Sequence, residues 1–470
     1  MKINNKFIVL MFVSLLFACN DAIEINPEDE FTPDITFESV SDLQQGLSGV
    51  YAQYDFENDI TFNSIFADNT KPGVDNGGQL INLYNWVLQA GEGNSTAIWN
   101  SYYAMINAAN RVIEASALVD VSDEERATFD NILGQLYALR AVAHYHLHTY
   151  YTTDYLDDSA LSSIIAERVP IVTEVFPRNT NEAMYAFINQ DLDTAQSLLA
   201  PETSDKGFIG QDFVTGLRAR IALLRNDASG ISFANDLIAK YDLANPTQYV
   251  NMYLDSNDTE VIFKLYRNSA VGGIWYFTNS AGPFMEASNG LYNVLNEASD
   301  VRLNVNINFG TNNGGPSVPE DNLHLINKYP GSSAPFVSNI KAMRVSEMYL
   351  IKAELQVKVQ NDLEGAALTL KSIRDARTGT STALVTYANP TLALADVMNE
   401  RRMELAFEGQ RYLDIKRNKA LLGGITRNAI DCASGGSCEL GASDYRFTLP
   451  IPQVEINAFP GITQNPGYSN

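Results

Sequence analysis

The stretch Asn399–Arg417 reads NERRMELAFEGQRYLDIKR and decides the fold of the chain. Glu400, Glu404 and Glu408 recur at every fourth residue, which places their carboxylates on one helix face with Cβ atoms about 5–6 Å apart. A glycosidase places its two carboxyl groups on either side of the sugar, whereas these point the same way. We therefore expect structural ion pairs rather than catalysis, formed with the arginines of the same stretch, Arg401, Arg402, Arg411 and Arg417.

Helical periodicity extends outward from this stretch over most of the chain. Apolar stripes run through 97–118 and from Ser122 to about Tyr151, where Ser122 and Glu125 form a capping-box pattern. Gly409 is expected to end its helix in the left-handed conformation. Further helices are predicted over 180–199, 211–225, 231–241, 341–359, 362–377 and 391–416.

The spacing of these helices predicts the fold class. The helices over 341–359 and 362–377 resemble one tetratricopeptide-type hairpin, although a strict thirty-four-residue repeat is absent. Alanine at many seam positions lets helices approach closely. We therefore expect a mainly α fold of tetratricopeptide-like helical hairpins forming one body, with long irregular loops and a few short strands, one of them at Glu260–Tyr266.

Two regions interrupt the helices and are rich in Asn, Gly, Pro and aromatic residues, namely 60–95 and 245–337. Irregular excursions from a rigid frame are where binding sites concentrate. Sugar rings present apolar C–H faces that stack on aromatic rings. Trp275, Tyr276 and Phe277 follow two glycines and are the first ligand-binding candidates, the alternative being that they cover the core beneath a loop.

A second group of candidates is less distinctive. Tyr84 and Trp86 form a second platform if their segment is extended, but the apolar residues that follow them favour a buried strand. Asp68, Asn69 and Arg267 are polar candidates for hydrogen bonds to hydroxyl groups.

The N-terminus indicates export. Lys2 and Lys6 precede an apolar run that is too short to span a bilayer, and this pattern predicts a cleaved signal peptide over residues 1–18. Leu16-Phe17-Ala18-Cys19 resembles a bacterial lipobox. That resemblance implies cleavage before Cys19 and a lipid on its sulfur, so the chain is expected to be anchored to a membrane and not to span it.

The net charge, the two remaining cysteines and the histidines argue against nucleic-acid binding, redox chemistry and zinc binding. A net charge of −24 disfavours nucleic acid and anionic headgroups as partners. Cys432 and Cys438 flank a short flexible segment, and a disulfide between them is favoured over free thiols in an exported protein. His144, His146 and His148 fit a packed helix better than a zinc site. No metal and no cofactor is predicted.

Three further matches carry a family resemblance. The stretch 399–417 resembles the late motif of the SusD/RagB family of outer-membrane nutrient-binding lipoproteins. The closing segments Pro450-Ile451-Pro452, Glu455-Ile456 and Gln464-Asn465-Pro466-Gly467-Tyr468 resemble the end of that family, and Trp99-x-x-Tyr102 with Ile106 and Asn110 resembles its early helix. Gln410 and Phe459-Pro460-Gly461 depart from the usual residues.

The resemblance implies a helical fold with four tetratricopeptide-like hairpins, no enzymatic activity and a SusC-like TonB-dependent transporter as partner. The expected organisation is a signal peptide over 1–18 and a single SusD-like domain over 19–470 at the outer-membrane surface. Within that domain we expect an extended strap over 19–36, a helical framework over 37–244 and 338–420, an irregular ligand-side excursion over 245–337 and a C-terminal segment over 421–470.

The expected function is capture of oligosaccharide or polysaccharide for delivery to the transporter. A peptide-capturing member of the same import system, a surface glycosidase and a helical scaffold that binds only proteins remain alternatives. The shared motifs belong to the framework, and they leave the identity of the ligand open.

Overall fold

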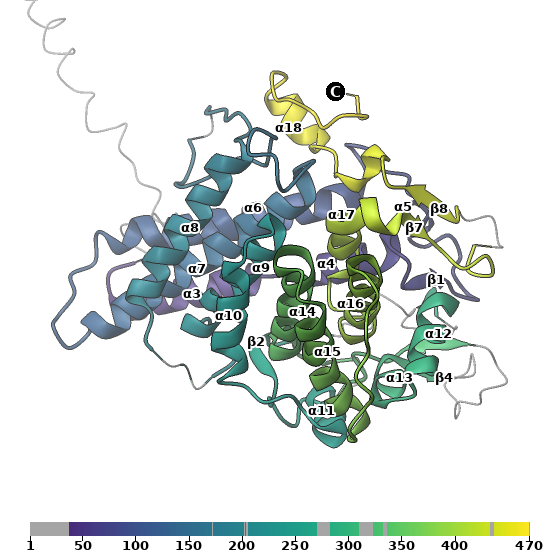
Figure 1. The fold of residues 1–470 in the computed structure, drawn as a ribbon. Helices are drawn as coiled ribbons and strands as arrows, with labels where there is room; N and C mark the ends of the chain where they lie inside the picture. Colours follow the sequence, from purple (N-terminus) through teal and green to yellow (C-terminus); the bar gives the residue numbers. More distant parts are fainter. Residues whose placement is uncertain are drawn as a thin grey trace, which may run out of the picture.

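The computed structural model describes residues 37–171, 173–201, 203, 205–269, 283–309, 323–331, 336–432 and 437–469. Most of them form helices, and the long helices α6 and α7 lie side by side across the molecule (Figure 1). No helix among these residues is both long and apolar enough to cross a bilayer. The mainly α architecture expected from the sequence is confirmed.

The first half of the chain is a series of helices packed on their neighbours. α6 packs on α7, α7 on α8, and α9 on α10. Ser39 caps the first helix, accepting a hydrogen bond from the Asp42 N–H while the Asp42 carboxylate accepts one from the Ser39 N–H. The elements are α3 (Val40–Gln53), α4 (Glu57–Phe66), β1 (Thr70–Pro72), α5 (Ile81–Tyr84), α6 (Gly93–Ser116), α7 (Arg126–Tyr151), α8 (Asn181–Leu198), α9 (Gln211–Arg225) and α10 (Ser229–Ile238).

The range 245–337, predicted as an irregular excursion, contains short helices as well as strands. Local caps explain them: Asn245 and Gln248 form a capping box with Pro246 at the first helical position, and Ser288 and Asp300 cap the next two helices. The elements are α11 (Pro246–Tyr253), β2 (Val261–Leu265), β3 (Met285–Ala287), α12 (Asn289–Ala298), α13 (Val301–Asn306), β4 (Ile307–Phe309) and β5 (His324–Ile326).

The final part contains the hairpin predicted from 341–377, with one correction. Ile340–Arg344 forms strand β6 and pairs antiparallel with β2, so the helix begins at Val345 and not at Lys341. The elements are β6 (Ile340–Arg344), α14 (Val345–Leu355), a π-helical turn (Gln356–Gln360), α15 (Leu363–Thr378), α16 (Pro390–Glu404), α17 (Arg411–Leu422), β7 (Gly424–Thr426), β8 (Glu439–Gly441), a 3₁₀ turn (Tyr445–Phe447) and α18 (Gln453–Ala458).

The stretch 399–417 does not form one helix up to Gly409. α16 ends at Glu404, Phe407 and Gly409 both adopt positive φ angles (61° and 70°), and α17 starts at Arg411. A side chain on Gly409 would meet the ring of Phe56 at 2.9 Å, so glycine is required there by both conformation and space. The resulting turn carries Glu408 into the interior.

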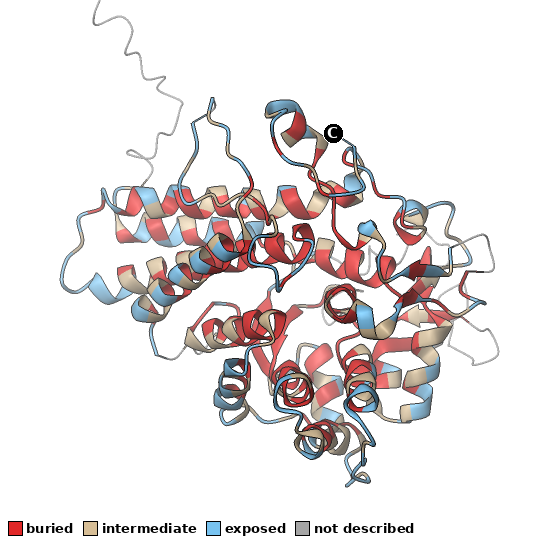
Figure 2. Ribbon diagram, turned by 45° about the horizontal axis from the view of Figure 1, so that its top comes forward, coloured by how far each residue is buried: buried red, intermediate tan, exposed pale blue. Residues whose placement is uncertain are grey.

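Small antiparallel ribbons and one main core complete the architecture. Among the described residues the strands pair as β1–β3, β2–β6, β4–β5 and β7–β8. The main hydrophobic core is shared by the N-terminal helices, β2, β6 and α14, and a smaller one lies between α14, α15 and α16. Helix faces turned toward neighbouring elements are buried, and outer faces are exposed (Figure 2).

Candidate functional site

The acids of the 399–417 stretch lie in a buried charge cluster. Glu404 accepts hydrogen bonds from Arg344 at 2.9 Å and from Arg377 at 2.8 and 2.9 Å, and both guanidinium groups also reach Glu260. Glu408 receives two hydrogen bonds from Arg344, each 2.9 Å long. The members of the buried charge cluster are Glu260, Asp300, Glu400, Glu404 and Glu408 with Arg302, Lys328, Arg344, Arg374 and Arg377.

Pairing favours the charged form of Glu404 in spite of its burial. Burial alone would raise the pKa of Glu404, but Arg377 and Arg344 hold it well below the usual value. Burial lowers the pKa of Lys328 to about 8, although Glu408 opposes that change. Each charge of the cluster has at least one partner of opposite sign, as buried charges require. The expected structural role is confirmed.

The partners expected for these acids were wrong. The arginines that do pair with Glu400 and Glu404 lie on α13, β6 and α15, because the two acids face those elements across the core. Arg402 and Arg411 instead bind Asp68, while Arg401 and Arg417 bind Asp414.

Asp68 and Asn69, predicted as ligand-binding candidates, are buried in the framework. Asp68 accepts hydrogen bonds from Arg411 at 2.7 and 2.8 Å, and Asn69 accepts one from Arg402 at 3.0 Å. Burial would raise the pKa of Asp68, but Arg402 and Arg411 hold it well below its usual value. Their exposed fractions are 6% and 0%, so neither side chain is open to a ligand.

Tyr84 and Trp86 do not form an exposed platform. Both rings are buried, and the Arg427 guanidinium lies between them, 3.8 and 4.1 Å from the two ring centroids. Arg427 also donates to backbone carbonyls that include Phe66 and Ala67. The segment is helical up to Tyr84 and is not the extended strand that a platform would need. The Tyr84 and Trp86 rings form cation–π contacts with the buried Arg427.

A disulfide joins Cys432 and Cys438, with their Cα atoms 5.6 Å apart. It lies beside the same aromatic pair, since the Tyr84 hydroxyl donates to the Asp431 carbonyl at 2.8 Å. Trp275, Tyr276 and Phe277, as well as Cys19, lie outside the described residues.

The three histidines of α7 are buried and serve packing. His144 Nδ1 lies 2.9 Å from the Arg140 carbonyl oxygen, and His148 Nδ1 lies 2.9 Å from the Ser162 hydroxyl. Burial lowers the pKa of both imidazoles to about 3, so both are neutral at physiological pH. His146 stacks on Tyr102. In the part of the chain that the structure describes, no group of three or more potential ligands is arranged for a metal ion.

Arg267 is the one polar candidate that lines an open groove. This Tyr266 groove has a volume of about 670 Å³ and lies between the end of α3, the turn at 207–208 and the residues after β2. Tyr266 is 57% exposed and Phe208 is 36% exposed, so one groove presents two aromatic rings to solvent. A side chain on Gly207 would meet the Tyr266 ring at 2.1 Å, so glycine allows the ring to lie against the backbone.

Polar groups surround these two rings. Arg267 forms ion pairs with Glu57 and, at 3.9 Å, with Asp55. Its Nε is buried and has no hydrogen-bond partner among the described residues. The Tyr266 hydroxyl donates to Asp205 at 2.7 Å, a bond that raises the pKa of Tyr266 to about 12. The groove therefore offers two aromatic surfaces with charged groups beside them.

Sequence reasoning selected Arg267 and missed its neighbours Tyr266 and Phe208. A signal was present for Tyr266, because it ends the predicted strand Glu260–Tyr266 exactly where the chain leaves the sheet. No sequence signal marks Phe208, which reaches the groove only through the tertiary contact of its ring with Tyr51, 5.4 Å between centroids.

Comparison with known proteins finds one family model in each half of the chain. A model described as SusD family matches residues 289–468, and one described as starch-binding associating with outer membrane matches residues 23–215. A SusD-like protein P2 of Formosa agariphila is 24% identical over 99% of this chain and 100% of its own length.

Solved structures agree over nearly the whole chain. A SusD superfamily protein of Bacteroides thetaiotaomicron is 25% identical with a TM-score of 0.78, and the match covers 91% of this chain and 100% of that one. A SusD-like carbohydrate binding protein of Bacteroides vulgatus is 19% identical with a TM-score of 0.74, covering 91% of this chain and 98% of that one.

Proposed function

This chain belongs to the SusD family, and from that membership we propose that it is a cell-surface lipoprotein that binds oligosaccharide or polysaccharide and delivers it to a TonB-dependent outer-membrane transporter. The description of the matching N-terminal model as starch-binding, and that of the Bacteroides vulgatus structure as carbohydrate binding, support a glycan as the ligand.

The Tyr266 groove is the observation that carries the proposal. The exposed rings of Tyr266 and Phe208 lie in one groove, and aromatic faces suit the apolar faces of sugars. Arg267 lines the groove next to Tyr266, where its guanidinium group pairs with Glu57 and Asp55. The Asp55 carboxylate also lines the groove and adds an acceptor for hydroxyl groups. Trp275, Tyr276 and Phe277 follow shortly in the sequence and are proposed to contribute further rings.

We infer binding without turnover. The carboxylates beside the groove, Asp55 and Glu57, come from one short segment and both face the same arginine. That arrangement does not flank a glycosidic bond from two sides, as hydrolysis requires.

Isothermal titration of the purified chain with soluble neutral and acidic oligosaccharides tests the proposal. Tyr266→Ala should weaken binding of the recognised glycan about tenfold or more, since stacking on one ring contributes on the order of 1–2 kcal/mol. Glu364→Ala, at an exposed position on α15 that does not line the groove, is the control and should bind normally. Saturable heat with peptides alone would replace glycan by peptide as the cargo.

Membrane attachment is tested separately. Incorporation of labelled palmitate into the wild-type chain, and its loss in Cys19→Ser, would support the lipid anchor. Equal labelling of both would contradict it. Co-purification of a transporter with the wild-type protein from solubilised outer membranes tests the delivery step.

A further inference from the structure

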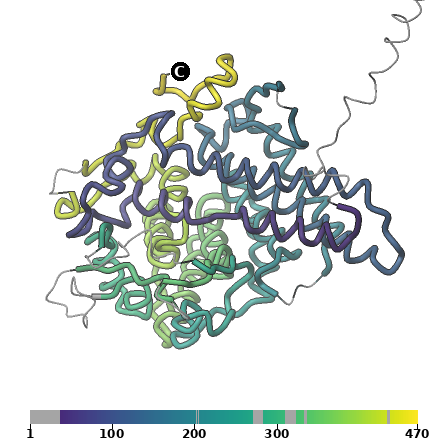
Figure 3. The backbone as a smooth tube through the Cα atoms, turned by 180° about the vertical axis from the view of Figure 1, so that it is seen from behind, coloured from purple at the N-terminus to yellow at the C-terminus, as the bar shows by residue number. Residues whose placement is uncertain are grey.

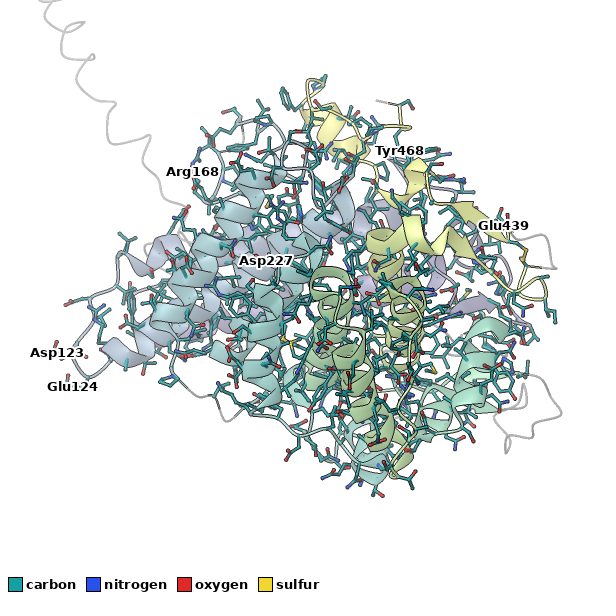
Figure 4. All side chains as sticks on the ribbon, in the orientation of Figure 1. Asp123, Glu124, Arg168, Asp227, Glu439 and Tyr468 are labelled. Carbon is teal, nitrogen blue, oxygen red and sulfur yellow. A yellow bond between two sulfur atoms is a disulfide. The ribbon has the colours of Figure 1, made fainter. Side chains whose placement is uncertain are left out.

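A second and larger cavity lies away from the Tyr266 groove. This α6–α8 cleft has a volume of about 840 Å³ and is formed by α6, α8, the segment 164–179 and residues 455–462. Figures 1 and 3 both place the segment before α8 beside α18, at the end of the molecule remote from β2. Arg168, labelled in Figure 4, lies at the outer edge of that segment.

Aromatic rings form much of the wall of the α6–α8 cleft. The buried Trp99 lies at the base, where its indole Nε1 donates to the Glu455 carboxylate at 3.0 Å. Four half-buried rings from separate elements complete the wall and leave part of their surface open. They are Tyr103, Phe176, Phe187 and Phe459.

Unused polar groups accompany these rings. The side-chain amides of Asn107 and Gln190 line the cleft and make no hydrogen bond within the described residues. The Glu167 carboxylate is also unengaged there, and Glu455 has one oxygen left after binding Trp99. Planar amides and carboxylates next to partly open rings are the groups that recognise sugar hydroxyls and C–H faces together.

The backbone of the cleft wall is poorly suited to an extended peptide. The N–H groups of Ile164, Ile165 and Ala166 donate to Tyr103, Asn179 and His144. The carbonyl groups of Ile164, Ala166 and Glu167 accept from Tyr103, Asn110 and Arg140. A peptide that adds a strand needs free groups of this kind, and the stretch 164–167 offers few of them.

The charge of the lining selects among glycans. Glu167, Glu174 and Glu455 contribute three negative charges, and Arg168 is the cation set against them. That cation is already paired with Glu174. The excess negative charge repels uronates and sulfated sugars.

We propose that the α6–α8 cleft is a second ligand site of this protein and takes a neutral oligosaccharide. The site stands on its own residues, shares none with the Tyr266 groove, and holds whether or not that groove binds glycan.

Two exposed alanines allow each cavity to be filled without removing a native contact. Ala186 on α8 lines the cleft, and Ala52 on α3 lines the Tyr266 groove. Calorimetry of the full chain would use the tetrasaccharides of starch, cellulose, laminarin, xylan and mannan, with oligogalacturonate as the acidic probe. Ala186→Trp should weaken binding of at least one neutral tetrasaccharide about tenfold or more, with Ala186→Ser as the control.

A second pair of variants tests the polar wall. Gln190→Ala should weaken the same binding event about three- to tenfold, the value of one hydrogen bond, whereas its neighbour Asn189→Ala, which does not line the cleft, should not. Circular dichroism and thermal melting of all variants exclude misfolding as the cause.

The outcomes separate the two sites. A binding event that is weakened by Ala186→Trp and not by Ala52→Trp supports the cleft, and a separate event that is weakened only by Ala52→Trp would belong to the groove. Weakening by Ala52→Trp alone overturns the cleft and leaves the proposed function standing. No binding of any neutral probe, or stronger binding of oligogalacturonate at the cleft, overturns the second site.

Discussion

The buried charge cluster and the α6–α8 cleft show opposite relations between sequence and function. The cluster contains much of the recognisable motif, and its Glu404 and Arg377 are fully buried and bonded to each other. The cleft takes Trp99 and Glu455 from the family motifs, but most of its partly open rings and the unbonded Gln190 amide lie outside them. A buried charge needs a defined partner, so it constrains several positions at once, whereas a cavity wall is free to vary with its ligand.

The largest expected effect is in the cluster. Glu404→Ala should lower the free energy of unfolding by about 3–5 kcal/mol, because Arg344 and Arg377 would be left buried with fewer partners. Urea denaturation measures the loss. Glu364→Ala, at an exposed position on α15, should cost less than about 0.5 kcal/mol. A cost of Glu404→Ala as small as that of the control would contradict the structural role of the cluster.

The next largest expected effect is a loss of stability at acid pH, caused by the buried histidines His144 and His148. Because the pKa values of His144 and His148 lie near 3 in the folded chain and near 6.5 when unfolded, the unfolded chain binds more protons as the pH falls below about 6.5. Stability should therefore fall between pH 6.5 and 3, by about 2 kcal/mol per histidine at pH 5. Glu404 stays ionised throughout most of this window because its pKa is held low.

The comparison of wild type with His148→Gln at pH 7 and pH 5 isolates that contribution. The variant should lose less stability between the two pH values than the wild type does. An equal loss in both proteins would show that His148 is not the neutral buried group described above.

Removal of the disulfide should have a smaller and local effect. Cys432→Ser with Cys438→Ser opens a loop with a sequence separation of six residues. Such a short loop contributes about 2 kcal/mol in the chain-entropy model. Thermal unfolding with and without reductant measures it, and glycan binding at the groove and the cleft should not change. Loss of glycan binding would place the ligand near Tyr84 and Trp86 after all.

The sequence predicts the elements that depend on local signals better than those that depend on distant contacts. The helices over 180–199, 211–225 and 362–377 were located within a residue or two, because caps and apolar stripes are local signals. Strand β6 was predicted as helix because its pairing with β2 joins positions far apart in the chain. Local periodicity carries no information about that partner.

The prediction of Tyr84 and Trp86 as an exposed ligand platform was wrong for a related reason. Tyr84 and Trp86 have the composition of a ligand platform, and only their distant partner Arg427 shows that they enclose a cation. Phe208 and Phe176 reach their cavities from turns that no periodic pattern marks. Arg267, selected as a polar ligand-binding candidate near the irregular regions, lines the Tyr266 groove, and its contact with a ligand stays a prediction.

The smallest expected effect on stability is at the Tyr266 groove, and it separates the ring from its hydroxyl. Tyr266→Phe removes the hydrogen bond to Asp205 at an exposed position, so stability should change by less than about 0.5 kcal/mol. Glycan affinity should stay within about threefold, because the stacking face remains, whereas Tyr266→Ala should lose about tenfold. Titration of both variants against the same oligosaccharide measures the difference. If Tyr266→Phe weakens binding as much as Tyr266→Ala does, the hydroxyl and its contact with Asp205 are what the ligand requires, and the groove recognises sugar by hydrogen bonding rather than by stacking.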